Sequence, residues 1–175
     1  MRISWVTSGA VEFRNGVRYS PLGSTRYRCL IPAKELELQG HLVSIISADA
    51  LKDLNALSKY DIGDAVIFSK SFNQKNEQFA AHVRGLHKLV ICDFCDFDFA
   101  TPGPLRDHLK KMSTLAHRLV AGSDALADIV AETLNTVRPT VVSDPYEGQA
   151  GVPAFSPMAG RLRLAWYGHA YNLQD

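Results

Sequence analysis

Short apolar runs rich in β-branched residues alternate along this chain with segments whose apolar residues recur every three or four positions. The first pattern is typical of strands and the second of amphipathic helices. The predicted strands are Ile3–Thr7, His41–Ile46, Ala65–Phe68, Lys88–Asp93, Arg118–Ala121 and Thr140–Val142. The predicted helices cover 30–38, 50–60, 73–86, 105–116 and 123–133. We expect residues 8–25, which are mostly polar, to form a long ordered loop.

Strands that alternate with helices in this way predict an α/β fold, a Rossmann-like parallel sheet with helices on both faces. Residues 1–143 are expected to form this domain. Residues 144–160 are rich in Gly and Pro without periodicity and predict a linker. The apolar run Leu162–Gly168 predicts a strand, so residues 161–175 are expected to begin a second, truncated domain.

Composition restricts the class of protein without identifying it. The chain has 175 residues, 46% of them hydrophobic, and a formal net charge of +1, so a single core of ordinary size is expected. Such a balanced charge gives no reason to expect a nucleic-acid partner. No apolar run is long enough to span a membrane and the amino terminus lacks a signal pattern, which predicts a cytoplasmic protein.

The segment between the first strand and the first helix is the first candidate for a ligand site. It contains Gly23, Ser24, Thr25, Arg26 and Arg28. Ser24 or Thr25 is predicted to cap the helix, and the exposed N–H groups of a helix start favour anions. A guanidinium group matches phosphate oxygens, although either arginine could instead face solvent.

Further candidates follow the third and fourth predicted strands, where open α/β sheets bind ligands. Lys70 could pair with an acidic group there or be a plain surface lysine. Asp93 and Asp96 could orient a hydroxyl or act as a general base, or they could bond to nearby turn backbone. With Asp98 they also suggest a cation site, but no histidine is close in sequence, and we predict no metal.

The three cysteines of the chain include the pair Cys92-x-x-Cys95. A redox pair of this spacing normally opens a helix, whereas this one spans the end of a predicted strand. A zinc site would need a second pair of ligands. Buried, unreactive thiols are therefore the better interpretation.

Several motifs, taken in order, resemble the amino-terminal half of group 1 glycosyltransferases of the GT-B fold. They are Gly23–Arg28, Lys70–Phe72, Asp93–Asp96, Ser143–Gly148 and Trp166–His169. The resemblance covers nearly the whole chain. It implies an acceptor-side domain, in which we expect Asp93 and Asp96 to be catalytic. The residues expected to bind ligand are Gly23, Ser24, Thr25, Arg26, Arg28, Lys70 and His169. A nucleotide sugar would serve as donor without metal or other cofactor.

The expected function is therefore sugar transfer from a nucleotide sugar to a glycan or lipid acceptor. This chain would hold only the acceptor-binding half and would be inactive alone. A peripheral association with membranes and a homo-oligomer both stay open. The alternative is a non-catalytic α/β domain that binds a phosphorylated or glycan ligand, because fold alone does not distinguish these functions. A flavodoxin-like regulatory domain is a weaker alternative.

Overall fold

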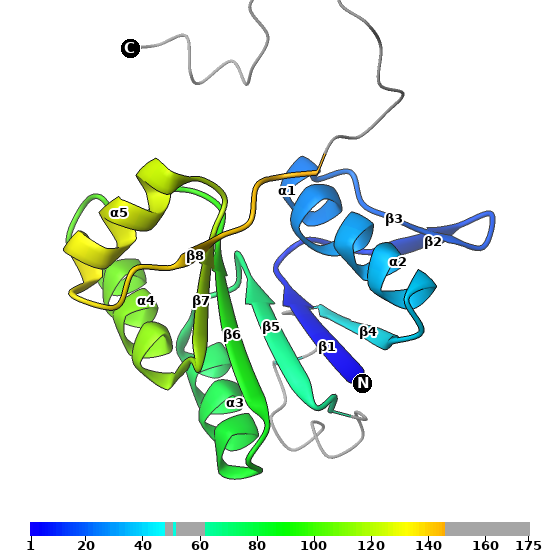
Figure 1. Ribbon diagram of the computed structural model, residues 1–175, viewed down its shortest axis with the longest axis horizontal. Helices are drawn as coiled ribbons and strands as arrows, with labels where there is room; N and C mark the ends of the chain where they lie inside the picture. Colours follow the sequence, from blue (N-terminus) through cyan, green and yellow to red (C-terminus); the bar gives the residue numbers. More distant parts are fainter. Residues whose placement is uncertain (48–50, 52–61, 146–175) are drawn as a thin grey trace, which may run out of the picture.

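The computed structural model describes residues 1–47, 51 and 62–145, and its main feature is a six-stranded sheet (Figure 1). The strands are β1 (Arg2–Thr7), β4 (Leu42–Ser47), β5 (Ala65–Ser69), β6 (Leu89–Phe94), β7 (Arg118–Ala121) and β8 (Thr140–Val141). They lie in the order β4-β1-β5-β6-β7-β8, and every neighbouring pair is parallel. The predicted Rossmann-like α/β fold is confirmed.

Helices lie on both faces of the sheet because its strands bury side chains in both directions. The helical segments are α1 (Gly23–Thr25), η1 (Arg26–Leu30), α2 (Ile31–Leu38), α3 (Gln74–Gly85), α4 (Pro104–Leu115) and α5 (Asp124–Leu134). The helices α3, α4 and α5 pack on one face, and α2 covers β1 and β4 on the other (Figure 1).

The alternation of side chains along each strand divides the core into two clusters. Val6, Phe68 and Val90 point toward α3 to α5 and belong to the larger cluster. Ile3 and Trp5 point the other way, where they pack with Cys29 and Ala33 of the η1–α2 segment. Along β5, Val66 and Phe68 are fully buried in the larger cluster, whereas Ile67 on the other face is only half-buried.

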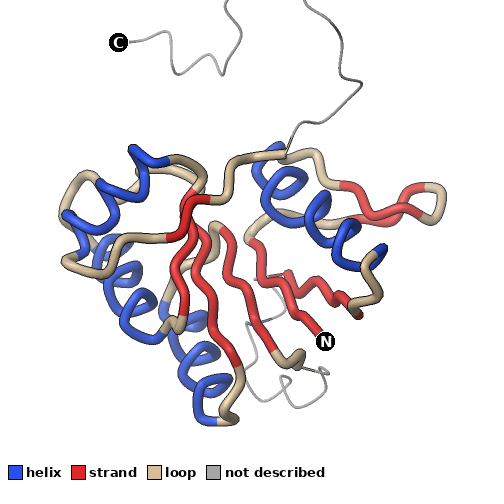
Figure 2. The backbone as a smooth tube through the Cα atoms, in the orientation of Figure 1, coloured by secondary structure: helices blue, strands red, loops and turns tan. Residues whose placement is uncertain are grey.

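The prediction of a single long loop over residues 8–25 is wrong. The strands β2 (Glu12–Arg14) and β3 (Val17–Tyr19) form an antiparallel hairpin that extends outward beside α2 (Figure 2). Asn15 and Gly16, at its turn, have φ values of 52° and 77°. An Asn-Gly pair is the usual sequence of such a two-residue turn because both positions need positive φ. The sequence therefore contained the signal for this hairpin.

The prediction of a loop over residues 23–28 is also wrong, because α1, η1 and α2 form a continuous helical segment from Gly23 to Leu38. Leu22 is the residue before its first turn, and no side chain caps it. The expected caps Ser24 and Thr25 therefore lie inside the helix. Residues 26–30 form a π-helical turn, a feature that is frequent at functional sites.

Some predictions lie outside the described residues. They include most of the helix expected over 50–60, the linker beyond Pro145 and the strand Leu162–Gly168. The division of the chain into two domains therefore stays a prediction. Among the helices described, none is long and apolar enough to cross a membrane.

Candidate functional site

The carboxyl ends of β1, β5 and β6 bring together three segments that are distant in the sequence. Ser8 follows β1, Lys70 follows β5, and Asp96 lies two residues beyond β6. The chain passes from β1 outward to β4 and then to β5 on the other side of β1, so the strand order reverses here. Open α/β sheets bind ligands in the crevice outside such a reversal.

A pocket of about 230 Å³ lies at this edge of the sheet, and we call it the strand-end pocket. Its lining combines a cation, two carboxylates, a hydroxyl and several apolar side chains. The residues are Ser8, Lys70, Phe72, Phe94, Cys95, Asp96, Asp98, Phe99, Leu105 and Leu109. The arrangement of an apolar wall with a few polar groups is typical of small-molecule sites.

Lys70 is held in an uncommon backbone conformation beside the pocket. Its φ is 49°, in the left-handed region that residues other than Gly and Asn rarely adopt. Its ammonium group forms an ion pair with Asp96, and about half of each side chain is exposed. Burial alone would lower the pKa of Lys70, but the hydrogen bond that Lys70 donates to Asp96 and the charges of Asp96 and Asp98 outweigh it and raise the pKa.

Phenylalanines form the apolar wall of the strand-end pocket. Phe72 is stacked on Phe94 with ring centroids 5.6 Å apart, and Phe94 meets the edge of Phe99 at 6.1 Å. Phe94 and Phe99 are each only 1% exposed. Buried rings fix the shape of this wall, so the pocket is preformed.

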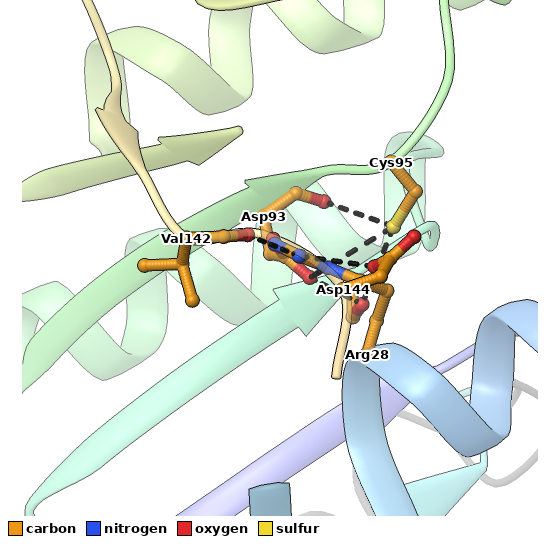
Figure 3. A network of polar contacts seen from close by, with 6 residues as sticks. Arg28, Asp93, Cys95, Val142 and Asp144 are labelled. Carbon is orange, nitrogen blue, oxygen red and sulfur yellow. Dashed lines mark hydrogen bonds and ion pairs between the residues drawn. The ribbon is translucent and has the colours of Figure 1, made fainter. Parts of the chain in front are cut away.

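A buried ion pair joins η1 to the end of β6 (Figure 3). Arg28 of η1 donates from Nε to Asp93 Oδ2 at 3.1 Å and from Nη2 to Asp93 Oδ1. Arg28 Nη1 donates to the carbonyl oxygen of Val142 at 2.5 Å and to Asp144 Oδ1 at 3.2 Å. Ser69 Oγ donates to Asp93 Oδ2 at 2.7 Å. Arg28 and Asp93 are only 5% and 3% exposed, and their charged groups bond to partners within the protein.

The ionisation of these groups follows from their surroundings. Burial lowers the pKa of Arg28, but the hydrogen bonds and charge of Asp93 outweigh it, and the net pKa is raised. Burial, with the negative charge of Asp93, raises the pKa of the Cys95 thiol to about 12. Burial also raises the pKa of Cys29 to about 12 and the pKa of Cys92 further. The predicted burial is confirmed for Cys92, whereas Cys95 is half-buried.

The residues predicted to bind ligand do not gather around one cavity. Lys70 and Asp96 line the strand-end pocket, whereas Arg28 and Asp93 bind each other. Thr25 is buried within 3.5 Å of Thr7 Oγ1, and Arg26 donates to the carbonyl oxygens of Ser20 and Pro21. Gly23 and Ser24 lie in the first helical turn, and His169 lies outside the described residues.

Sequence reasoning missed the aromatic wall and Ser8. The signal for the wall was the acidic and aromatic stretch over 93–99, which supplies Phe94 and Phe99 at and just beyond the end of β6. Within the described part of the chain, no group of three or more His, Cys, Asp and Glu side chains could hold a metal ion. The site therefore consists of hydrogen-bonding and apolar groups on the end of a parallel sheet.

The structure is that of an α/β protein with a pocket at the carboxyl edge of its sheet. No family model matches the chain, and no curated protein matches it. A solved structure that matches is the crystal structure of a galactofuranose binding protein, with 11% sequence identity and a TM-score of 0.44. The match covers 77% of this chain and 42% of that chain, so this chain spans less than half the length of that protein.

These comparisons correct the expected glycosyltransferase function. No family model supports that function, and the matching structure reported above is that of a galactofuranose binding protein, not of a glycosyltransferase. The geometry gives a physical reason for the wrong prediction. Arg28 belongs to the motif Gly23–Arg28 and Asp93 to the motif Asp93–Asp96, but the two side chains form an ion pair with each other in the interior. Ancestry shared with that family stays an untested prediction.

Proposed function

We propose that this chain is a ligand-binding α/β domain that holds a neutral, polyhydroxylated molecule of about monosaccharide size in the strand-end pocket. The observation that carries the proposal is the convergence of Lys70, Asp96 and Asp98 with the phenylalanine wall at the reversal of strand order. Carboxylates accept hydrogen bonds from hydroxyl groups, an ammonium group donates them, and an apolar wall packs against the C–H face of a sugar ring.

The charge of the pocket favours a neutral ligand over a phosphorylated one. Two carboxylates face one ammonium group there, and Lys70 is already paired with Asp96. The arginine that could bind phosphate, Arg28, is buried in its own ion pair. A phosphate group would meet net negative charge, which disfavours it.

The size of the pocket supports a small ligand. Sites for drug-sized molecules occupy roughly 300–1,000 Å³, whereas this one measures about 230 Å³. Binding without turnover is supported by the state of Asp93, because the carboxylate best placed as a base already accepts hydrogen bonds from Arg28 and Ser69.

The test is calorimetric titration of the full chain with neutral monosaccharides in pyranose and furanose forms, their phosphates and nucleotide sugars. We expect binding of a neutral sugar and no heat from its phosphate. Lys70→Gly and Asp96→Asn should each weaken that binding by tenfold or more. Glycine suits the φ of 49° at position 70, so this variant removes the ammonium group without backbone strain.

The matched control is Asp64→Asn, because Asp64 is an exposed carboxylate just before β5, at the opposite end of that strand from Lys70. It should leave sugar affinity unchanged. Preferential binding of the phosphorylated sugar, or full affinity in Asp96→Asn, would show that the strand-end pocket is not a neutral sugar site.

A further inference from the structure

A second pocket, which Arg28 and Asp93 also line, lies on the face of the sheet beside α2. It measures about 190 Å³ and is lined mainly by Trp5, Pro32, Ile67, Ile91, Val120 and Val142. We call it the sheet-face pocket. Its lining is almost wholly apolar, so the proposed sugar site does not account for it.

The pocket exists because one half of this sheet face has no helix over it within the described residues. On the other face, α3, α4 and α5 bury Val66, Val90 and Leu119. On this face α2 packs on β4, and Ile91 and Val120 are left only half-buried (Figure 1). Parallel sheets are normally covered on both faces, so an apolar covering element is expected here.

Trp5 adds a polar requirement to this apolar surface. The residue is 5% exposed, and its indole Nε1 has no hydrogen-bond partner among the described residues. A buried N–H group without an acceptor is costly. An occupant with apolar side chains, such as a peptide segment, would cover the apolar wall, and Trp5 is one of the residues that it would contact.

The path of the chain identifies the nearest such segment. Val142, Ser143 and Pro145 line the sheet-face pocket, and Arg28 fixes this stretch by bonding to the Val142 carbonyl oxygen and to Asp144. Pro145, the last residue that the structure describes, therefore lies at the pocket. Beyond it the sequence contains Leu162-Arg163-Leu164-Ala165-Trp166-Tyr167, in which Leu162, Leu164 and Trp166 alternate with the other residues.

We propose that the sheet-face pocket is the docking site of this chain's own segment Leu162–Tyr167. The connection over residues 146–161 is long enough to return to the rim, because an extended chain spans up to about 3.3–3.6 Å per residue. A tether of this length gives an effective concentration on the order of millimolar. The segment therefore competes well against a second copy or another protein.

The first test places the photo-cross-linking amino acid p-benzoylphenylalanine at position 142 of the full chain. Val142 lies at the rim and is 51% exposed, so the substitution is tolerable there. Irradiation should join position 142 to a peptide containing residues 162–167 of the same chain. The control places the same amino acid at position 137, where Val137 is 74% exposed and does not line the pocket.

Cross-links from position 142 to a second chain would show a dimer interface instead. An absence of cross-links to 162–167, or equal cross-linking from position 137, would also overturn the proposal. A second readout is the fluorescence of anilinonaphthalene sulfonate bound to the full chain. Leu164→Asp should raise this fluorescence severalfold by uncovering the pocket. Ala165→Asp adds the same charge at a position that does not belong to the alternating apolar set, and it should not raise the fluorescence. Equal signals from the two variants would contradict docking through Leu164.

Discussion

At the scale of single residues, the ion pair between Arg28 and Asp93 is the feature with the largest consequence. It joins η1 to β6, and through Nη1 of Arg28 it also holds the chain after β8. Two buried charges add little net stability when paired, but removing one leaves the other uncompensated in the interior. The pair therefore specifies where the helical segment lies against the sheet.

Asp93→Asn should lower the free energy of unfolding by about 3–5 kcal/mol, because it strands the buried guanidinium of Arg28. Adding Arg28→Met to this variant should recover part of the loss, since the uncompensated charge is then gone. Urea denaturation followed by circular dichroism measures both effects. The control is Arg138→Ala, which breaks exposed ion pairs with Asp124 and Asp128 and should change stability little. A small loss in Asp93→Asn would contradict the assigned role.

At the scale of secondary-structure elements, α3 shows how a local signal and tertiary packing act together. Asn73 accepts hydrogen bonds from the backbone N–H groups of Lys75 and Asn76 at 2.9 and 3.0 Å, which caps the helix. Phe79, Ala80 and Val83 form its buried face against the sheet. The cap also fixes the backbone next to Phe72, a residue of the strand-end pocket.

Asn73→Ala should reduce the free energy of unfolding by about 1 kcal/mol, because two helix N–H groups lose their acceptor. Thermal unfolding of the full chain is the measurement. Asn73→Asp keeps an acceptor and adds a negative charge at the helix start, so it should be at least as stable as the natural residue. If Asp and Ala destabilise equally, the hydrogen bonds at this cap are unimportant.

At the scale of the whole molecule, the buried thiols make stability depend on pH in the alkaline range. The pKa of Cys29 is raised to about 12 in the folded chain, chiefly by burial, against an unfolded value of about 8.5. Above the unfolded pKa the unfolded state loses the thiol proton and the folded state keeps it. The contribution of the thiol to stability is therefore fully present below the unfolded pKa, and it is lost as pH rises from there through the folded pKa.

Each such thiol should contribute a slope of up to about 1.4 kcal/mol per pH unit between about pH 8.5 and the folded pKa. Unfolding in urea at a series of pH values from 7 to about 11 measures this slope. Cys29→Ala should make it shallower. Val43→Ala, in the same core cluster, should lower stability without changing the slope. An unchanged slope in Cys29→Ala would mean that other groups cause the alkaline loss.

How far sequence reasoning reached differs from element to element. The run Ala65–Phe68 predicted the strand β5, and the helix predicted over 73–86 corresponds to α3. Both follow from local periodicity, which a sequence displays directly. Residues 23–28 were predicted to lie in a loop before the first helix, whereas they belong to a continuous helical segment in which Thr25, Arg28 and Cys29 are buried.

The candidate site was predicted less well for a physical reason. Periodicity places Lys70 and Asp96 at the ends of strands, but it does not say which strands become neighbours. Nor does it show that Asp93 faces Arg28, 65 residues earlier in the chain, and not a ligand. Charged residues near a strand end look alike in sequence, whether they meet substrate or each other.

By itself, the sequence determined the α/β class, the parallel sheet and the positions of most strands, because these depend on local hydrophobic patterns and turn residues. Only the tertiary structure decided the strand order, the pairing of Arg28 with Asp93 and the assembly of the strand-end pocket from Ser8, Lys70 and Asp96. These features depend on contacts between residues far apart in the chain. The free energy that such contacts contribute through burial and ion pairing belongs to the packed molecule and not to any one segment.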